Sequence, residues 1–311
     1  MRVLVTGGGG FIGSHLAERL LDDGHDVRVL DSFATGRRSN LQHLDGVELL
    51  EGDVQSYERV HNAVRGCDVV LHQAALPSVP RSIQDPLTTS AVNVTGTLNV
   101  LLAARDAGVR RLVYASSSSV YGANPALPKR EDHMPQPLSP YAVSKLAAEN
   151  YCRSFSGIYG MSCVCLRYFN VFGHRQDPTS QYSAVIPRFI AAVLDGRRPT
   201  VFGDGEQSRD FTHVSDVVEA NVAAMHSDAG RGEAVNVACG HRITLNEVVR
   251  LLGEFEDRDV QPDYLPPRPG EVLHSQADVS RARELFGFEP RTSFADGLRM
   301  TLEHAREVAM R

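Results

Sequence analysis

The sequence lacks several features that would place it in other classes of protein. No uninterrupted apolar run approaches the ~18 residues that a membrane-spanning helix needs. The formal net charge is −6, so the chain lacks the basic surplus of proteins that bind nucleic acids or acidic membrane surfaces. We therefore expect neither a nucleic acid nor a membrane as a partner.

Signatures of disulfides and metal sites are also missing. The chain has five cysteines, an odd number, without a Cys-x-x-Cys pair, and none of its twelve histidines belongs to a His-Glu-x-x-His motif. Cys163 and Cys165 would face the same side of a strand, which suits core packing better than metal binding. These patterns predict reduced thiols, no metal and a cytoplasmic location. Met1 and Arg2 lead directly into an expected strand, so we expect no signal peptide.

What the first half of the 311 residues does contain is an alternation of strand and helix patterns. Short apolar runs typical of buried strands occur at 3–5, 27–30, 47–50, 69–71, 112–114 and 163–166. Helical patterns occur at 14–21, 57–64, 88–107 and 140–159. Sequential parallel strands need a crossover, usually a helix, between them. The alternation predicts an α/β fold with a doubly wound parallel sheet of the Rossmann type.

After residue 167 the pattern changes to longer loops and shorter helices. Loops are expected at 170–183 and 265–270, and helices at 184–194, 216–225, 244–252, 280–285 and 294–309. This mixture predicts a smaller, mixed C-terminal domain that closes over a site on the sheet. We place the cofactor domain at 1–168 and the substrate domain at 169–311, with about 207–238 returning to the sheet.

A glycine-rich turn at 6–13, TGGGGFIG, separates the first expected strand from the first helix. Glycines there permit a tight turn and close approach to a pyrophosphate, which the helix N-terminus also attracts. Four glycines alone could be a flexible loop, but an acidic residue ends the second strand about 20 residues further on, as the dinucleotide fingerprint requires. The predicted cofactor residues are Gly7, Gly10, Phe11, Ile12, Gly13 and Asp31.

Asp31 also bears on which dinucleotide binds. Its carboxylate would accept hydrogen bonds from the adenosine ribose and repel a 2′-phosphate, which favours NAD over NADP. Arg37 and Arg38 lie close by in the sequence and leave NADP open. Asp53 and Val54 follow the third strand and are expected to meet adenine, with a plain strand-end turn as the alternative.

Tyr141 and Lys145 lie four residues apart at the start of an expected helix, so their side chains share one face. A free tyrosine has a pKa near ~10, and a neighbouring ammonium and a positive nicotinamide ring would favour its phenolate. The pair is common on helix surfaces, but together with the glycine turn it predicts a proton-transfer site. A serine run at 116–119 follows the fifth strand, where hydroxyls would face a ligand; a simple loop is the alternative.

Together these motifs resemble the extended short-chain dehydrogenase/reductases, specifically the nucleotide-sugar 4-epimerases, over essentially the whole chain. The stretches at 72–82, 166–173, 175–178 and 183–187 (HQAALPSVPRS, LRYFNVFG, RQDP and SAVIP) are similar to the UDP-N-acetylglucosamine (UDP-GlcNAc) 4-epimerase branch. The resemblance implies an NAD-dependent isomerase that interconverts UDP-GlcNAc and UDP-GalNAc through a transient 4-keto sugar. The pair UDP-glucose and UDP-galactose is implied as a second substrate pair.

The family's functional positions fall on named residues of this chain. The resemblance makes Tyr141 the base, Lys145 its modulator and a ligand of the nicotinamide ribose, and Ser117 the partner of the sugar O4. It places Gln73, Ala74 and Asn93 along the cofactor. It assigns the UDP-sugar to Ser78, Ser118, Asn170, Ala184, Val185, Phe202, Arg209, Arg268 and Ser275. Among these, Phe202 would pack on uracil, Arg209 and Arg268 would bind the diphosphate, and Ser275 would form a wall of the sugar pocket.

Other functions stay open. A strict UDP-glucose 4-epimerase is one, and a dehydratase or decarboxylase is another, although related dehydratases carry Asp-Glu where this chain has Ser118 and Ser119. UDP-uronic acid 4-epimerases share the serine run but favour threonine at the position of Asn170. A non-catalytic NAD-binding module would usually have lost Tyr141 or Lys145. The resemblance also implies a homodimer in which 88–107 and 140–159 form a four-helix bundle with the partner.

Overall fold

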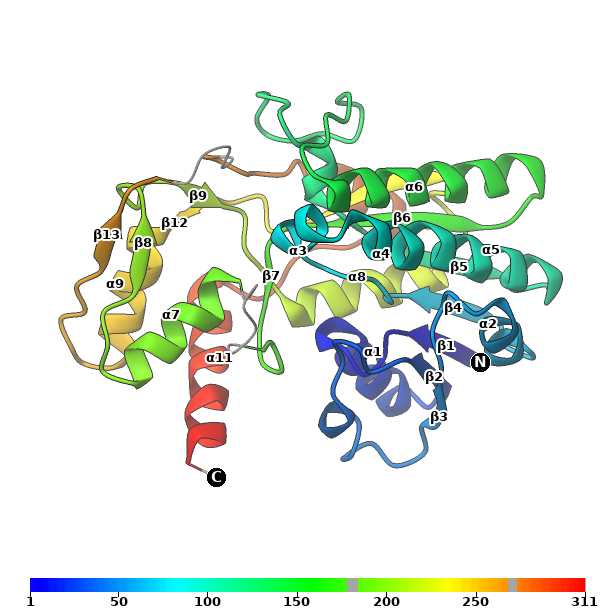
Figure 1. Cartoon of the computed structure of the whole chain (residues 1–311), viewed down its shortest axis with the longest axis horizontal. Coiled ribbons are helices and arrows are strands. Elements are labelled where there is room, and N and C mark those ends of the chain that lie inside the picture. Colours follow the sequence, from blue (N-terminus) through cyan, green and yellow to red (C-terminus); the bar gives the residue numbers. More distant parts are fainter. Residues whose placement is uncertain (178–183, 268–272, 311) are drawn as a thin grey trace.

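The computed structural model describes residues 1–177, 184–267 and 273–310. Its larger part is built on a seven-stranded sheet in the order β11-β6-β5-β4-β1-β2-β3 (Figure 1). The strands are β1 (Arg2–Thr6), β2 (Asp26–Asp31), β3 (Glu48–Glu51), β4 (Val69–His72), β5 (Arg111–Ser117), β6 (Cys163–Tyr168) and β11 (Glu233–Val237). Every neighbouring pair in the sheet is parallel. All the carboxyl ends therefore meet at one edge.

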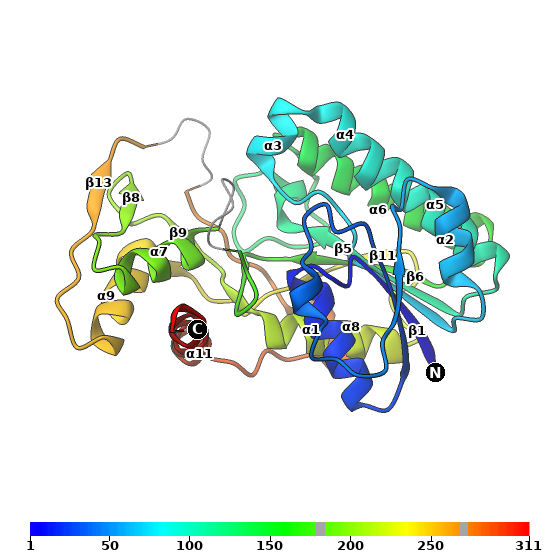
Figure 2. The ribbon, with the colours of Figure 1, turned by 60° about the horizontal axis from the view of Figure 1, so that its bottom comes forward.

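Helices cover both faces of this sheet (Figure 2). One face carries α1 (Phe11–Asp22) and α8 (Val214–His226), and the other carries α2 (Tyr57–Val64), α5 (Gly96–Asp106) and α6 (Pro140–Ile158). The strands alternate between the two cores, because Val3 and Val5 pack with α1 and α8 whereas Leu4 packs with α2 and α5. The doubly wound parallel fold is confirmed.

The helix expected at 88–107 begins earlier than expected. It runs from α4 (Pro86–Ser90) through a π-helical turn (Ala91–Thr95) into α5. The Asp85 side chain accepts a hydrogen bond from the Thr88 backbone N–H at 3.0 Å, and Pro86 occupies the first helical position. Among the described residues, this run is the one helix whose length and composition would let it cross a membrane. Polar residues interrupt the apolar ones along this helix, so the sequence shows no uninterrupted apolar run there. In the structure the helix packs against α2 and α6.

The smaller part has its own apolar core. It is formed by α7 (Val185–Leu194), α9 (Leu245–Phe255) and α11 (Phe294–Ala309). Three two-stranded sheets accompany them: β8 (Thr200–Phe202) with β13 (Asp263–Leu265), β9 (Ser208–Arg209) with β12 (Ile243–Thr244), and β7 (Val171–Phe172) with β10 (Thr212–His213). The expected loop at 170–183 thus contains a short strand. The chain returns to the large sheet at β11, and the domain boundary at residue 168 stays a prediction.

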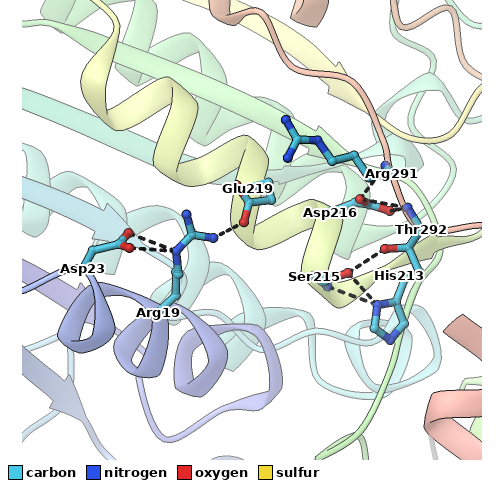
Figure 3. Close-up of polar contacts among 8 residues, drawn as sticks. All are labelled: Arg19, Asp23, His213, Ser215, Asp216, Glu219, Arg291 and Thr292. Carbon is cyan, nitrogen blue, oxygen red and sulfur yellow. Dashed lines mark hydrogen bonds and ion pairs between the residues drawn. The ribbon is translucent and has the colours of Figure 1, made fainter.

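Helix α8 connects the two parts (Figure 3). The Asp216 carboxylate at its start accepts hydrogen bonds from the backbone of the segment that enters α11, including Thr292 N–H at 3.3 Å. The Ser215 hydroxyl lies 2.9 Å from that of Thr292. One turn further along, Glu219 pairs with Arg19 of α1. These contacts fix α11 and its core relative to the sheet that carries the site.

Candidate active site

A cavity of about 1400 Å³ lies at the carboxyl ends of β1 to β6. The sheet contributes one wall through the residues at its strand ends, such as Asp31 and Ser117. The smaller part contributes Asn170, Arg209 and Ser275. The volume exceeds the ~300–1,000 Å³ of typical single-ligand pockets, so the cavity has room for a dinucleotide beside a second ligand.

The glycine turn brings the backbone to the cavity surface between β1 and α1. Gly7 has φ +72°, and a Cβ atom there would lie 2.7 Å from the backbone of Ala74. A Cβ atom on Gly13 would lie 2.1 Å from the Gly7 carbonyl oxygen. Only glycine fits at these two positions. The turn therefore presents bare backbone and the amino end of α1, the arrangement that binds a pyrophosphate.

Asp31 ends β2 and faces the same part of the cavity. Its carboxylate accepts hydrogen bonds from the Gly9 N–H at 2.8 Å and the Phe33 N–H at 2.7 Å. Burial raises the pKa of Asp31, and these two hydrogen bonds oppose the rise. A carboxylate has further acceptor positions, so it can bind ribose hydroxyls while it anchors the turn. The anchoring contact is a second role that the sequence did not indicate.

Ser117, Tyr141 and Lys145 come together at the end of β5. Ser139 caps α6 by accepting a hydrogen bond from the Ala142 N–H at 3.2 Å, so Tyr141 lies in the first turn and Lys145 one turn later. The Lys145 Nζ donates to the Ala115 carbonyl at 2.7 Å and lies 5.9 Å from the centroid of the Tyr141 ring. The Ser117 side chain lies close enough to Tyr141 to lower the pKa of the phenol. The three predicted catalytic side chains thus share one corner of the cavity.

Burial dominates the electrostatics of this corner in the protein alone. Burial raises the pKa of Tyr141, although the neighbouring Ser117 side chain opposes the rise. Burial also lowers the pKa of Lys145 to about 8, against the opposing effect of Glu149. Both shifts favour the neutral forms, and the expected lowering of the Tyr141 pKa, which combined the ammonium with a positive nicotinamide ring, stays a prediction. In the chemistry suggested by the sequence, that lowering has to come from the positive ring of the bound cofactor.

Most of the other predicted residues also line the cavity. On the cofactor side these are Gly10, Phe11, Ile12, Asp53, Val54, Gln73 and Ala74, and on the other side Ser78, Ser118 and Ala184. Asn93, Val185 and Phe202 do not line it, so their predicted contacts stay predictions, and Arg268 lies outside the described residues. Asn93 instead accepts a hydrogen bond from the Leu76 N–H at 2.8 Å and donates to Ser144 at 3.0 Å. It supports the cavity wall from behind.

Some residues of the site were missed from the sequence. Lys129 lines the cavity, and it and Lys145 are the only two lysines of the chain. This scarcity is a signal that could have drawn attention to Lys129. Arg175 and Gln176 also line the cavity without an assigned role. Among the described residues, no group of three or more His, Cys, Asp or Glu side chains is arranged to hold a metal ion.

Fold and site together define a Rossmann-type enzyme with the Ser-Tyr-Lys constellation of the short-chain dehydrogenase/reductases. Residues 3–238 match the model of the NAD dependent epimerase/dehydratase family, and the chain belongs to this family. The predicted family and NAD as the cofactor are thereby confirmed, and the glycine turn and Asp31 fit that cofactor.

Similar proteins include several UDP-sugar 4-epimerases. The UDP-glucose 4-epimerase of Mycolicibacterium smegmatis is 40% identical over 98% of this chain and 99% of its own length. The solved UDP-N-acetylglucosamine 4-epimerase of Methanobrevibacter ruminantium is 38% identical with a TM-score of 0.94, covering 99% of this chain and 98% of that one. The solved UDP-glucose 4-epimerase of Thermotoga maritima is 36% identical with a TM-score of 0.95, covering 99% and 100%. The chain therefore groups with the NAD-dependent UDP-sugar epimerases.

Proposed function

We propose that the chain interconverts UDP-GlcNAc and UDP-GalNAc by inversion at C4, with UDP-glucose and UDP-galactose as a second pair. The observation that carries the proposal is the meeting of Ser117, Tyr141 and Lys145 in the same cavity as the glycine turn. Inversion without net oxidation requires cofactor and sugar to share one site through the whole cycle. A cavity with room for both ligands suits that requirement.

The protein's own groups have distinct tasks in this reaction. NAD, held by the glycine turn and Asp31, would supply the hydride acceptor and donor for C4. Ser117 and Tyr141 hold the C4 hydroxyl, and Tyr141 takes its proton and later gives it back. Lys145, fixed by the Ala115 carbonyl, keeps a positive charge beside the tyrosine and binds the nicotinamide ribose. The intermediate 4-keto sugar must turn over in the cavity between the two transfers.

The sugar nucleotide is proposed to lie on the side of the smaller part. Arg209 lines the cavity, and its Nη1 donates to the Leu273 carbonyl at 2.9 Å, which fixes the direction of the guanidinium. A guanidinium held in this way suits the diphosphate, because it offers bidentate contacts to oxyanions. Arg268 as a second diphosphate ligand and Phe202 against uracil complete the proposal.

Ser275 supports the N-acetylated substrates. It lines the cavity, and its N–H donates to the Ser208 carbonyl at 3.0 Å, so β9 holds the segment in place. A serine side chain leaves space for a 2-acetamido group that a larger side chain would fill. Solved relatives with 31% and 37% identity are in complex with an analogue of UDP-glucuronic acid and with UDP-glucuronic acid itself, so a uronic acid substrate is the main rival.

The proposal is tested by incubating the purified protein separately with UDP-GlcNAc, UDP-glucose and UDP-glucuronic acid and resolving the products by NMR. We expect UDP-GalNAc from the first, UDP-galactose from the second and no turnover of the third. Tyr141→Phe serves as the matched control. Turnover of UDP-glucuronic acid alone, release of CO₂, or a 4-keto-6-deoxy product would replace the proposal with an epimerase of uronic acids, a decarboxylase or a dehydratase.

We further propose a cytoplasmic homodimer. The run from α4 to α5 lies beside α6 on one face of the sheet (Figure 2). Apolar side chains on these helices are exposed, among them Leu87 at 83%, Ile158 at 71% and Val143 at 53%. Pairing with a second copy as a four-helix bundle would cover them. Sedimentation equilibrium is expected to give twice the chain mass, and a monomer would refute the dimer.

A further inference from the structure

A buried ion pair lies directly behind the catalytic corner. The Glu149 carboxylate accepts two hydrogen bonds from the Arg167 guanidinium, from Nε at 2.9 Å and from Nη2 at 2.8 Å. The two side chains are 2% and 3% exposed. Moving both charges out of water is costly, so a buried pair of this kind is weak evidence of a purely stabilising role. The position of the ion pair beside the catalytic residues points to a role in the reaction.

The pair touches the elements that carry the catalytic residues. Glu149 lies on α6 one turn beyond Lys145, so the two side chains share a face of that helix. The Ser116 hydroxyl donates to Glu149 Oε1 at 2.5 Å, and Ser116 precedes Ser117 in β5. On the other side, the Arg167 guanidinium lies 4.8 Å from the centroid of the Tyr121 ring, which lines the cavity.

Glu149 also differs in charge from the other titratable groups around Lys145. The described titratable neighbours that interact with Lys145 are Tyr141, Glu149 and Cys152 on α6, Tyr114 on β5, Cys165 on β6 and His72 on β4. Among these neighbours Glu149 is the one carboxylate. Burial lowers the pKa of Lys145 to about 8, and Glu149 is the strongest of the effects that oppose it.

We propose that Glu149 is a positioning residue of the epimerase reaction: it places a carboxylate one helical turn from Lys145 and fixes Ser116, and with it the strand end that carries Ser117. Arg167 holds the carboxylate in the orientation that the Ser116 contact needs and offsets part of its negative charge. The inference rests on the proposed function, because it assigns Glu149 a task within that reaction. Glu149 itself does not line the cavity and is not a catalytic residue.

The scarcity of lysine makes a direct test practical. In protein labelled with ¹³C and ¹⁵N at lysine and loaded with NAD, the side-chain signals come from Lys145 and Lys129 alone, and Lys129 serves as an internal reference. We expect Glu149→Gln to lower the pKa of Lys145 by about one unit. We expect Arg167→Gln, which leaves Glu149 unpaired, to raise it. Lys129 should titrate unchanged in both variants.

The pH dependence of kcat with saturating UDP-GlcNAc supplies the second readout. Its alkaline limb should move to lower pH in Glu149→Gln and to higher pH in Arg167→Gln. Glu48→Gln is the control, because it removes the carboxylate that pairs with Arg28 at 2.9 Å, between β2 and β3. This control variant should change neither the alkaline limb of the pH profile of kcat nor the pKa of Lys145.

The outcomes separate this inference from the proposed function. If Glu149→Gln lowers only the melting temperature and leaves the Lys145 titration and the alkaline limb in place, Glu149 is merely structural and the inference is overturned. If that variant does not fold, Arg167→Gln decides: a raised pKa of Lys145 supports the inference and an unchanged one overturns it. The titration needs no turnover, so a wild-type protein that converts no UDP-sugar would refute the function alone.

Discussion

The two halves of the cavity are built in different ways. On the cofactor side the surface is largely backbone: Gly7 and Gly13 have no room for a Cβ atom, and α1 begins directly behind them. On the sugar side the surface consists of side chains such as Asn170, Arg209 and Ser275, which come from separate segments of the smaller part. A site made of backbone tolerates little change, whereas a site made of side chains can change its ligand by substitution. Substrate range should therefore be set on the sugar side.

The largest expected effect lies where the two halves meet. Tyr141→Phe removes the base but keeps the ring, so binding of NAD and of the UDP-sugar should stay nearly intact. We expect kcat to fall at least ~10²-fold, the usual scale for a positioned general base. Steady-state kinetics together with calorimetric binding measure both quantities. A variant that keeps more than a tenth of the wild-type activity would show that Tyr141 is not the base.

The cofactor half should not tolerate one added methyl group. In Gly13→Ala the new Cβ would lie 2.1 Å from the Gly7 carbonyl oxygen, so the turn must distort. We expect NAD affinity to fall about 10- to 100-fold, which corresponds to ~1–3 kcal/mol of strain. Gly157→Ala in α6 is the matched control, because a Cβ atom there would have no described atom from outside the neighbouring helix backbone within 4 Å. If Gly13→Ala and Gly157→Ala bind NAD with equal affinity, the NAD site is not formed by closely packed backbone at Gly13.

Asp31→Ala should weaken NAD binding and improve the relative affinity for NADP. The ribose hydroxyls lose an acceptor and a 2′-phosphate loses a repulsive neighbour, so we expect the preference to shift about tenfold, or ~1.4 kcal/mol. Because burial raises the pKa of Asp31, the preference in the wild type should fade on acidification sooner than for an ordinary carboxylate. Titration of both cofactors at several pH values measures this.

Asp31→Asn is the control for the anchoring contacts, since it keeps one oxygen that can accept from the Gly9 N–H. If neither variant changes the preference, the selectivity lies elsewhere, and Arg37 and Arg38 are the next residues to test. The sequence places those two arginines six and seven residues after Asp31.

The smallest effect should appear on the sugar side, as a change of specificity. Ser275→Tyr should suppress turnover of UDP-GlcNAc by a clash with the acetamido group, while turnover of UDP-glucose survives or rises. The ratio of kcat/KM for the two substrates is compared between variant and wild type. A change of less than about threefold, under ~1 kcal/mol, would remove Ser275 as the residue that admits the acetamido group.

The difference between the cofactor half and the sugar half of the cavity also explains which features the sequence predicts well. Buried parallel strands are continuous apolar runs, so β1, β2, β4, β5 and β6 were expected close to their actual positions. The strand expected at 47–50 also forms, as β3, but it is the edge strand of the sheet and is largely exposed rather than buried. Helix α2 occupies the expected residues, Tyr57–Val64, because Ser56 caps its start and accepts from the Arg59 N–H at 3.4 Å. The cofactor half also depends on short motifs that lie within one strand–turn–helix unit. Local patterns of this kind can be recognised in a single sequence.

Features that depend on contacts between distant segments were not predictable in this way. The strands β7 and β10 have two residues each, too few to show a period. The lowered basicity of Lys145 and the raised pKa of Tyr141 follow from burial, which spacing along α6 does not express. Lys129 comes to the cavity through its pairing with Ala277, far away in the sequence. The sugar half is built from such contacts.

The central claim is that hydride leaves C4 and returns to C4 within one cavity that holds both ligands. It is tested most directly with UDP-GlcNAc deuterated at C4, incubated with the purified protein in ordinary water and analysed by NMR. We expect the UDP-GalNAc formed to keep its deuterium at C4, because Tyr141 exchanges only the hydroxyl proton with the sugar. Loss of deuterium to water or its transfer to C6 would contradict the claim.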